Sequence, residues 1–455
     1  MGKDQFSRRE FLGVGAAVAG ASLVGNPILP AFEPVRQAPR APASQRVRFG
    51  IIGVGMQGNS LLRESIRFPE VECAAACDVY DGRHTLAREI AGESLPVTRQ
   101  YQRLLDDQSI DCLIVAVPDH WHRKIVLDAL SAGKDVYIEK PMSHDAADGV
   151  AMVDAARRSG RIVQVGSQRV SSRLCARVKE LLAEGVIGDL MLAEAWLGRN
   201  SPSGAWQYPP PPDLSPANLD WDTWLGDAPR RPFDPILFAR WRAWREYGTG
   251  VAGDLLVHLV SGFIYMTGLN QPPTQAMSVG GIRRWKDGRN TPDVQAVQYY
   301  YGELPVSMRL NLGTGMPEGY RFQGSKGVLE VGGGQISLTP QSGTDGSPSY
   351  YSSSFPRAMR EAYVEAWNAE NAPKPGEQPE LTETISIRGP GYDDIKPHLW
   401  NFFEAVRSRG TVVEDAVFGH NAALACHMAN ESYYRRAVVS SNDVLRGMPS
   451  GEGRG

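Results

Sequence analysis

An aspartate and a histidine stand four residues apart in the segment 253–258, GDLLVH. In an α-helix this spacing places both side chains on one face, with their Cβ atoms about 5 to 6 Å apart. At that distance a carboxylate can orient an imidazole, and imidazole titrates near neutral pH. The spacing therefore predicts a proton-accepting pair, Asp254 and His258. A buried histidine that merely follows a helix-start aspartate is the structural alternative.

A lysine follows a predicted buried strand, Asp135–Ile138, in the tripeptide Glu139-Lys140-Pro141. A lysine ammonium can donate a hydrogen bond to a substrate oxygen as negative charge develops on it. The bond before a proline is also the place where a cis peptide costs least. Taken by itself, however, the tripeptide is equally typical of a surface turn.

Three glycines in GxGxxG spacing follow the apolar, strand-like run Val47–Ile52. The first glycine permits a tight turn, the second lets the backbone approach a pyrophosphate, and the third lets the next helix pack on the strand. The amino terminus of that helix then faces the phosphate groups. The pattern predicts a dinucleotide-binding loop that consists of Gly53, Gly55, Met56, Gln57 and Gly58.

An acidic residue ends the second strand-like run, Val71–Cys77, twenty residues after Gly58. Asp78 can accept hydrogen bonds from a ribose 2′-hydroxyl, and it would repel a 2′-phosphate about 4 Å away by roughly 1 to 4 kcal/mol. NAD is therefore the predicted cofactor. Arg83 could offset part of this repulsion, which keeps NADP as an alternative, and a helix cap is the structural alternative for Asp78.

Alternating strand and helix patterns predict a doubly wound parallel sheet of the Rossmann type over residues 46–166. After Gly188 the pattern changes to short strands with longer loops, which predicts a large, mostly antiparallel open sheet within residues 167–440. The expected fold class is therefore α/β, with a second, α+β domain for substrate binding and oligomerisation. Helices within residues 396–440 are expected to pack back over these domains, and residues 441–455 to form a disordered tail. An open sheet leaves a face to cover, which favours a homo-oligomer, a dimer or tetramer.

The combination of GxGxxG, the tract 118–122 (PDHWH) and Glu139-Lys140-Pro141 resembles the Gfo/Idh/MocA family of glucose–fructose oxidoreductase and inositol dehydrogenase, over nearly the whole chain from residue 47 to 439. The resemblance implies a cis bond before Pro141 and a nicotinamide pocket that includes Pro118, His122, Glu139 and Lys140. It also implies that Lys140, Asp254 and His258 are the catalytic residues of a hydride transfer. Members of the sugar oxidoreductase type place a tyrosine where this chain has His258.

A segment rich in tryptophan and proline, residues 200–250, interrupts the second domain. Together with the tract 165–169 (VGSQR), it resembles a secreted subgroup of that family. Its aromatic rings could pack on the C–H faces of a sugar, or they could fix the segment and mediate subunit contacts. The candidate substrate residues are Gln168, Arg169, Trp241 and Arg242. No metal site is predicted, because the histidine pair in PDHWH has no cysteine or acidic cluster beside it.

The amino terminus has the order of an export signal, with SRREFL at 7–12 before a glycine- and alanine-rich run at 13–25. This order resembles a twin-arginine signal, so residues 1–45 are predicted to be signal and linker, with a short membrane anchor as the alternative. The expected partner is the twin-arginine export machinery, and the expected location is the periplasm or cell envelope. A net charge of -3, from 48 basic and 51 acidic residues, disfavours a nucleic-acid partner.

These features predict an exported NAD(P)-dependent oxidoreductase that acts on a secondary hydroxyl of a sugar, glycoside or cyclitol. Twin-arginine export carries folded proteins, and no pool of free cofactor exists outside the cytoplasm, so the cofactor should stay tightly bound. An NAD-dependent glycoside-cleaving enzyme, which removes and returns the hydride in one turnover, is the alternative. The glycosidases that resemble this family look different at the Glu-Lys-Pro turn, so Lys140 favours a dehydrogenase. A non-catalytic nucleotide- or sugar-binding envelope protein is the second alternative.

Overall fold

The computed structural model describes residues 46–341, 348–371, 382–386 and 394–447. The predicted export signal and linker, residues 1–45, lie outside the described residues. Among the helices that the structure describes, none is both long enough and apolar enough to cross a membrane.

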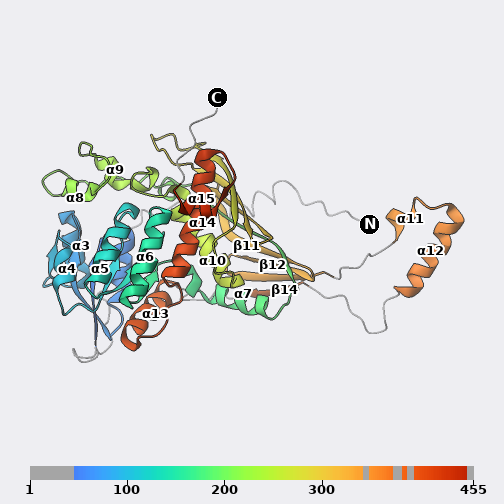
Figure 1. Ribbon diagram of the computed structural model, residues 1–455, viewed down its shortest axis with the longest axis horizontal. Coiled ribbons are helices and arrows are strands. Elements are labelled where there is room, and N and C mark those ends of the chain that lie inside the picture. The colour runs from blue at the N-terminus through green and yellow to red at the C-terminus, as the bar shows by residue number, and fades with distance from the viewer. Residues whose placement is uncertain (1–45, 342–347, 372–381, 387–393, 448–455) are drawn as a thin grey trace, which may run out of the picture. The chain divides into compact units, whose positions relative to one another are not determined.

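Six parallel strands form the first sheet, in the order β3-β2-β1-β4-β5-β6. Figure 1 labels helices α3, α4, α5 and α6 of this domain. The strand order reverses beside β1, and the crevice beyond the carboxyl ends of β1 and β4 is where such a sheet binds its ligand. β1 is an almost continuous buried run, as expected for a strand with both faces covered. The strands are β1 (Val47–Ile52), β2 (Val71–Cys77), β3 (Val97–Thr98), β4 (Cys112–Val115), β5 (Asp135–Ile138) and β6 (Val163–Val165). The helices of this domain are α2 (Met56–Ser65), α3 (Asp81–Ala91), α4 (Gln102–Asp106), α5 (His122–Ser131) and α6 (Ala146–Ser159).

Nine strands form the second sheet, in the order β14-β13-β12-β11-β7-β10-β9-β8-β15. Within this sheet, β7 and β10 are the only parallel pair among the described strands. Burial alternates along β9 and β12, so one face of the sheet packs on the core and the other stays open. The strands are β7 (Leu190–Gly198), β8 (Gln275–Gly281), β9 (Val294–Tyr301), β10 (Leu304–Asn311), β11 (Met316–Gly324), β12 (Gly327–Gly332), β13 (Gln335–Pro340), β14 (Glu383–Ser386) and β15 (Val439–Ser440). The predicted fold class is confirmed.

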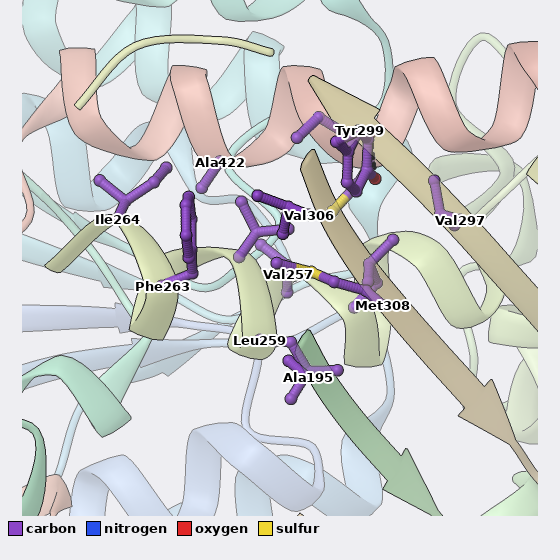
Figure 2. Packing of buried hydrophobic residues seen from close by; sticks show 14 of the residues in the cluster. Ala195, Val257, Leu259, Phe263, Ile264, Val297, Tyr299, Val306, Met308 and Ala422 are labelled. Atoms are coloured by element: carbon purple, nitrogen blue, oxygen red, sulfur yellow. Dashed lines mark hydrogen bonds between the residues drawn. The ribbon is translucent and has the colours of Figure 1, made fainter. Parts of the chain in front are cut away.

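Two long apolar helices, α10 (Val257–Thr267) and α14 (Ala416–Arg435), cover the packed face of this sheet. Figure 2 shows Phe263 of α10 beside Ala422 of α14, with Val306 of β10 close by. Ala422 belongs to the core under the second sheet, whereas its neighbour Ala423 belongs to a core of the first sheet. Because α14 buries one face in each domain, it fixes the two sheets against each other. The remaining helices are α7 (Arg173–Ala183), α8 (Trp221–Leu225), α9 (Pro235–Ala239), α11 (Ser349–Ser352), α12 (Arg357–Glu370), α13 (Ile395–Ser408) and α15 (Ser441–Leu445).

Helix α13 returns to the first sheet, where Phe403 packs on Phe49 with ring centroids 5.6 Å apart. Its His398 is fully buried; Nδ1 lies 2.8 Å from the Ser171 hydroxyl and Nε2 lies 2.9 Å from the carbonyl oxygen of Val165. Burial lowers the pKa of His398 to about 4, although the hydrogen bond to Val165 opposes this. The folded protein therefore holds this imidazole neutral at a pH where the unfolded chain protonates it.

Acid should destabilise the protein through His398. Its folded pKa lies below the unfolded value near 6.5, so the stability is present above pH 6.5 and is lost as pH falls toward 4. The expected loss at pH 5 relative to pH 7.5 is about 2 kcal/mol. Urea unfolding at both pH values measures the free energy of unfolding. Its decrease from pH 7.5 to pH 5 should be smaller in His398→Gln than in the wild type by this amount. Ser171→Ala, which removes only the hydroxyl partner, should keep the wild-type loss, and an unchanged loss in His398→Gln would exclude this role.

Several elements differ from the sequence-based predictions. Helix α12 and strands β13 and β14 were not predicted; α12 has no buried residue, so its sequence lacks the strong apolar stripe of a core helix. The predicted tail is wrong at its start, because Ser441–Leu445 form α15. Ser440 and Asp443 make a capping box there, which satisfies the first backbone amides of that short helix.

Candidate active site

The glycine loop after β1 has the shape that a dinucleotide requires. Gly53 has a φ of +87°, and a Cβ at Gly58 would lie 2.0 Å from the Gly53 carbonyl oxygen. A Cβ at Gly55 would meet nothing within 4 Å, so this position is open. Helix α2 begins without a side-chain cap, which leaves its first amides available for a pyrophosphate. The loop therefore fits the phosphate groups of a dinucleotide.

Asp78 stands at the carboxyl end of β2, beside this loop. Its Oδ2 accepts a hydrogen bond from the Val54 amide at 2.8 Å, and its Oδ1 accepts one from the Tyr80 amide at 3.0 Å. Burial raises the pKa of Asp78, while the two amides and the charge of Arg83 lower it. The residue that precedes helix α3 is Tyr80, so Asp78 does not serve as that helix's cap. This position suits the predicted ribose contact, and Arg83 lies within electrostatic reach of it.

Replacing Asp78 should weaken the preference for NAD over NADP. In Asp78→Ala the repulsion of a 2′-phosphate is lost, so the ratio of kcat/KM for NAD to that for NADP should fall by at least about fivefold, or ~1 kcal/mol. Steady-state kinetics with each cofactor would measure the ratio. Asp81→Ala is the matched control, because Asp81 pairs with Arg99 at 2.6 Å. A ratio that stays the same in Asp78→Ala would remove Asp78 from ribose recognition.

Lys140 leaves the end of β5 and reaches the second domain. The Lys140–Pro141 bond is cis, as the family resemblance implied. The Lys140 ammonium donates to Oδ1 of Asp254 at 2.9 Å and to the Asp254 carbonyl oxygen at 2.8 Å. Asp254 lies on a π-helix, Ala252–Leu256. A Cβ at Gly253 would lie 3.0 Å from the Pro141 ring, so this glycine permits the close approach of the two segments.

Glu139 is buried beneath Lys140 and joins three elements. Its Oε1 accepts hydrogen bonds from the side-chain amides of Gln57 at 3.0 Å and Gln168 at 2.7 Å, and its Oε2 accepts one from the Lys140 amide. The Gln168 amide also donates to the Tyr137 hydroxyl. The buried Gln168 amide nitrogen is thus committed to Glu139 and Tyr137, and the role of Gln168 as a substrate residue stays a prediction.

Asp254 collects three donors in the buried interior of the site. Besides Lys140, Arg242 Nε donates to Oδ1 at 3.0 Å and Trp206 Nε1 donates to Oδ2 at 2.9 Å. Burial alone would raise the pKa of Asp254, but the charges of Lys140 and Arg242 and the Lys140 hydrogen bond hold it below its usual range. Asp254 is therefore a carboxylate throughout the pH range in which the protein works.

The predicted hydrogen-bonded pair of Asp254 and His258 is not formed. Both Asp254 oxygens are taken by other donors, and His258 Nδ1 is buried without a hydrogen-bond partner among the described residues. The reason is local, since the π-helix turns with i to i+5 bonds, so a spacing of four no longer aligns two side chains. Burial first, and then the charges of Lys140 and Arg169, lower the pKa of His258, while the Asp254 charge opposes this. His258 is therefore a neutral imidazole that shares the electrostatic field of Lys140 and Asp254.

Three further predicted residues have defined contacts. The Arg242 guanidinium lies 4.2 Å from the centre of the Trp241 ring, so Trp241 supports Arg242. Arg169 pairs with Glu318 at 3.0 Å. The charge of Arg169 thus acts on His258, and Arg242 binds Asp254. Trp241 is half-buried.

His122 supports the predicted nicotinamide pocket from behind. It is buried, with Nδ1 2.8 Å from the Pro141 carbonyl oxygen and Nε2 3.0 Å from that of Val117. Since both ring nitrogens contact the backbone, His122 holds together the segments at Val117 and Pro141. Its place in the nicotinamide pocket stays a prediction. No group of three or more histidine, cysteine, aspartate or glutamate residues is arranged for a metal in the described part of the chain.

Sequence reasoning missed Trp206, Arg199 and Tyr208. Trp206 is buried and has a φ of +63°, and it was recognised only as one of several tryptophans in the insertion. Arg199 directly follows β7, and its charge acts on both Asp254 and His258. Tyr208 lies within reach of the charges of Arg242, Asp254 and Arg199. The sequence could have indicated Arg199 only as a charged residue directly after a predicted strand.

Residues 47–167 match the model of a family described as "Oxidoreductase family, NAD-binding Rossmann fold", GFO_IDH_MocA. The first domain is thus similar to the NAD-binding domain of this oxidoreductase family. Inositol 2-dehydrogenase/D-chiro-inositol 3-dehydrogenase of Lactiplantibacillus plantarum is 28% identical over 149 residues, 32% of this chain and 43% of that protein. Glycosyl hydrolase family 109 protein 1 of Shewanella sp. strain MR-4 is 28% identical over 206 residues, 41% of this chain and 45% of that protein. The chain thus spans less than half the length of these curated relatives.

A solved structure extends the likeness to both domains. Levoglucosan dehydrogenase in complex with NADH and levoglucosan has a TM-score of 0.63 and 18% identity, over 87% of this chain and 100% of that chain. The similarity at this identity concerns the fold. The predictions of an NAD-binding oxidoreductase domain and of NAD as its cofactor are confirmed for residues 47–167, and the family of the whole chain stays a prediction. The twin-arginine subgroup, export and oligomerisation stay predictions.

Proposed function

We propose that this protein is an exported NAD-dependent oxidoreductase that oxidises a secondary hydroxyl of a sugar, glycoside or cyclitol. The observation that carries the proposal is the meeting of Lys140, from the end of β5, with Asp254, from the π-helix of the second domain, at 2.9 Å. A lysine delivered across two domains beside a neutral histidine suits proton transfer to and from a hydroxyl. A protein that only held a nucleotide would need neither group.

Each residue of the site has a separate role in the proposed hydride transfer. A bound nicotinamide supplies the hydride acceptor. Lys140, oriented by Asp254, donates a hydrogen bond to the substrate oxygen and stabilises the charge that develops there. His258 is neutral and can take up the hydroxyl proton, and the nearby Asp254 charge favours the resulting imidazolium through space. The Glu139 and His122 contacts keep the Lys140 turn in place.

Export through the twin-arginine machinery to the periplasm or envelope requires that the cofactor travel with the protein. Residues 213–226, here called the strap, support such retention. The strap binds the loop after β2 through Asp81 N to Asn218 O at 2.9 Å and Asp220 N to Val79 O at 3.0 Å. It also binds the loop after β4, where Trp121 Nε1 donates to the Trp224 carbonyl oxygen at 3.0 Å. These two loops follow the strands on either side of β1, so the strap joins them across the mouth of the glycine loop.

One side-chain hydrogen bond of the strap can be removed by a single substitution. The Tyr80 hydroxyl donates to Asp213, and Tyr80 forms an isolated bridge with Leu219. In Tyr80→Phe the release of NADH, followed by its fluorescence, should speed up by about tenfold, the value of a lost hydrogen bond to a charged group. Tyr300→Phe, on the open face of the second sheet, is the control. Wild-type protein from its own host should also release about one nicotinamide cofactor per chain on denaturation, and empty protein would contradict retention.

Glycoside cleavage is the second candidate, favoured by the likeness to the Shewanella protein that carries a glycosyl hydrolase name. Both candidates can be separated by following absorbance at 340 nm and the products after adding glucosides, free sugars or cyclitols. Accumulating NADH supports the dehydrogenase. Released aglycone without net reduction supports the glycosidase, and the absence of both overturns the proposed activity.

The open face of the second sheet supports a homo-oligomer. Met277 and Val279 of β8 and Tyr300 of β9 are exposed there at 54%, 60% and 49%. A contiguous exposed apolar face of this kind marks a protein contact. Light scattering coupled to gel filtration should therefore give the mass of a dimer or tetramer.

A further inference from the structure

The charges of three cationic side chains, Lys140, Arg169 and Arg199, act on His258, and a fourth, Arg242, binds Asp254. These four side chains differ in how many of their hydrogen-bond donors already have a partner. Lys140 is bound to Asp254, and Arg169 is paired with Glu318 at 3.0 Å. Arg242 uses only its Nε on Asp254, so both terminal nitrogens remain available among the described contacts. Arg199 has no side-chain hydrogen bond or ion pair within the described residues.

Arg199 stands at an end of the second sheet that borders the candidate site. Arg199 follows the end of β7, where its backbone amide is bonded to Asn311 at 2.8 Å. The neighbouring strand β11 carries Glu318, the partner of Arg169. Seven residues after Arg199, Trp206 donates to Asp254, the same carboxylate that binds Arg242. The charge of Arg199 reaches Asp254, His258 and Glu318.

An uncommitted guanidinium is costly in a partly buried site unless a ligand uses it. Guanidinium groups match the two oxygens of a carboxylate with parallel hydrogen bonds, and such charge-assisted bonds are about twice as strong as neutral ones. Neutral hydroxyls would also accept these donors, but they would leave the charge unmatched. Acidic groups of the chain lie nearby, at Asp119, Glu139 and Asp394, but none of them bonds to Arg199 or to the terminal nitrogens of Arg242 in the described structure.

We propose that the substrate carries a carboxylate, as a uronic acid does, and that Arg199 with the free end of Arg242 binds it beside Lys140 and His258. This assignment rests on the proposed function and names the substrate class of the same site. A carboxylate there would have a second effect. It would offset the cationic charges that, after burial, lower the pKa of His258, and so make the imidazole a better proton acceptor when the substrate is bound.

The test compares D-glucuronate with D-glucose and glucose 6-phosphate. Binding to the protein as purified is measured by calorimetry, and oxidation is measured by kcat/KM. Glucuronate should bind at least about tenfold more tightly than glucose, the factor for one good charge-assisted contact. Arg199→Gln should lose most of this difference. Arg309→Gln, at an arginine whose side chain is 53% exposed on β10, is the matched control and should keep the difference.

The outcomes separate this inference from the proposed function. Arg199-dependent binding of glucuronate without oxidation of any sugar would support the carboxylate site and overturn the dehydrogenase. Oxidation of glucose with no preference for glucuronate would support the dehydrogenase and overturn the carboxylate site. Tighter binding of glucose 6-phosphate than of glucuronate would also overturn it, because it would identify the anion as a phosphate. A preference that Arg199→Gln leaves intact would exclude Arg199.

Discussion

Replacing Lys140 with alanine should reduce turnover by at least about 100-fold, the range for losing acid–base or oxyanion assistance. Lys140 is the side chain that links the strand end of the first domain to Asp254 in the second domain. Cofactor binding should be largely kept, since the glycine loop and Asp78 do not contact the Lys140 ammonium. Stopped-flow measurement of NADH formation and NADH titration would separate the two effects.

Lys124→Ala serves as the matched control for this loss. Lys124 is 53% exposed and pairs with Asp128 on helix α5, so its removal should leave turnover unchanged. Lys140→Arg tests geometry, because it keeps the charge while changing the shape of the donor. Wild-type turnover in Lys140→Ala would remove this lysine from the mechanism.

Replacing Asp254 with alanine should destabilise the protein by about 3 to 5 kcal/mol, the cost of leaving buried cations without their partner. Lys140, Arg242 and Trp206 would all lose the carboxylate at once, and Lys140 would keep only its bond to the backbone carbonyl oxygen of residue 254. The pKa of Asp254 is lower in the folded protein than in the unfolded chain, where it is near 3.9. The stabilisation that Asp254 gives is therefore complete above pH 3.9, and it is lost only as pH falls through the folded pKa. The difference from wild type in urea unfolding should therefore be equal at pH 5 and pH 8.

Asp222→Ala is the control for an exposed ion pair. Asp222 is 85% exposed and pairs with Arg230, so its loss should cost less than about 1 kcal/mol. Asp254→Asn keeps an oxygen acceptor but removes the charge, and it should recover only part of the lost stability. A variant Asp254→Ala as stable as Asp222→Ala would show that the three donors find other partners.

The two domains differed in how much of them could be predicted. Apolar runs and glycine spacing identified β1, β2 and the loop from Gly53 to Gly58, because these features depend on residues that are close in sequence. Exposed elements such as α12 were missed because they bury no face that would leave a pattern. The insertion was recognised by composition alone, and only the structure shows that Trp206 and Trp224 are the buried tryptophans of that segment.

The amino-acid sequence by itself determined the order of the elements, the dinucleotide loop and the presence of Lys140, Asp254 and His258, since local spacing and periodicity specify each of them. Only the tertiary structure decided their partners. Lys140 and Asp254 are 114 residues apart, and they meet because α14 fixes the two sheets together and Gly253 lets the π-helix approach Pro141. The same packing gives Asp254 to Lys140 and Arg242 instead of His258, and it brings Arg199 into the site. Such pairings depend on how separate cores are joined, which no short sequence pattern encodes.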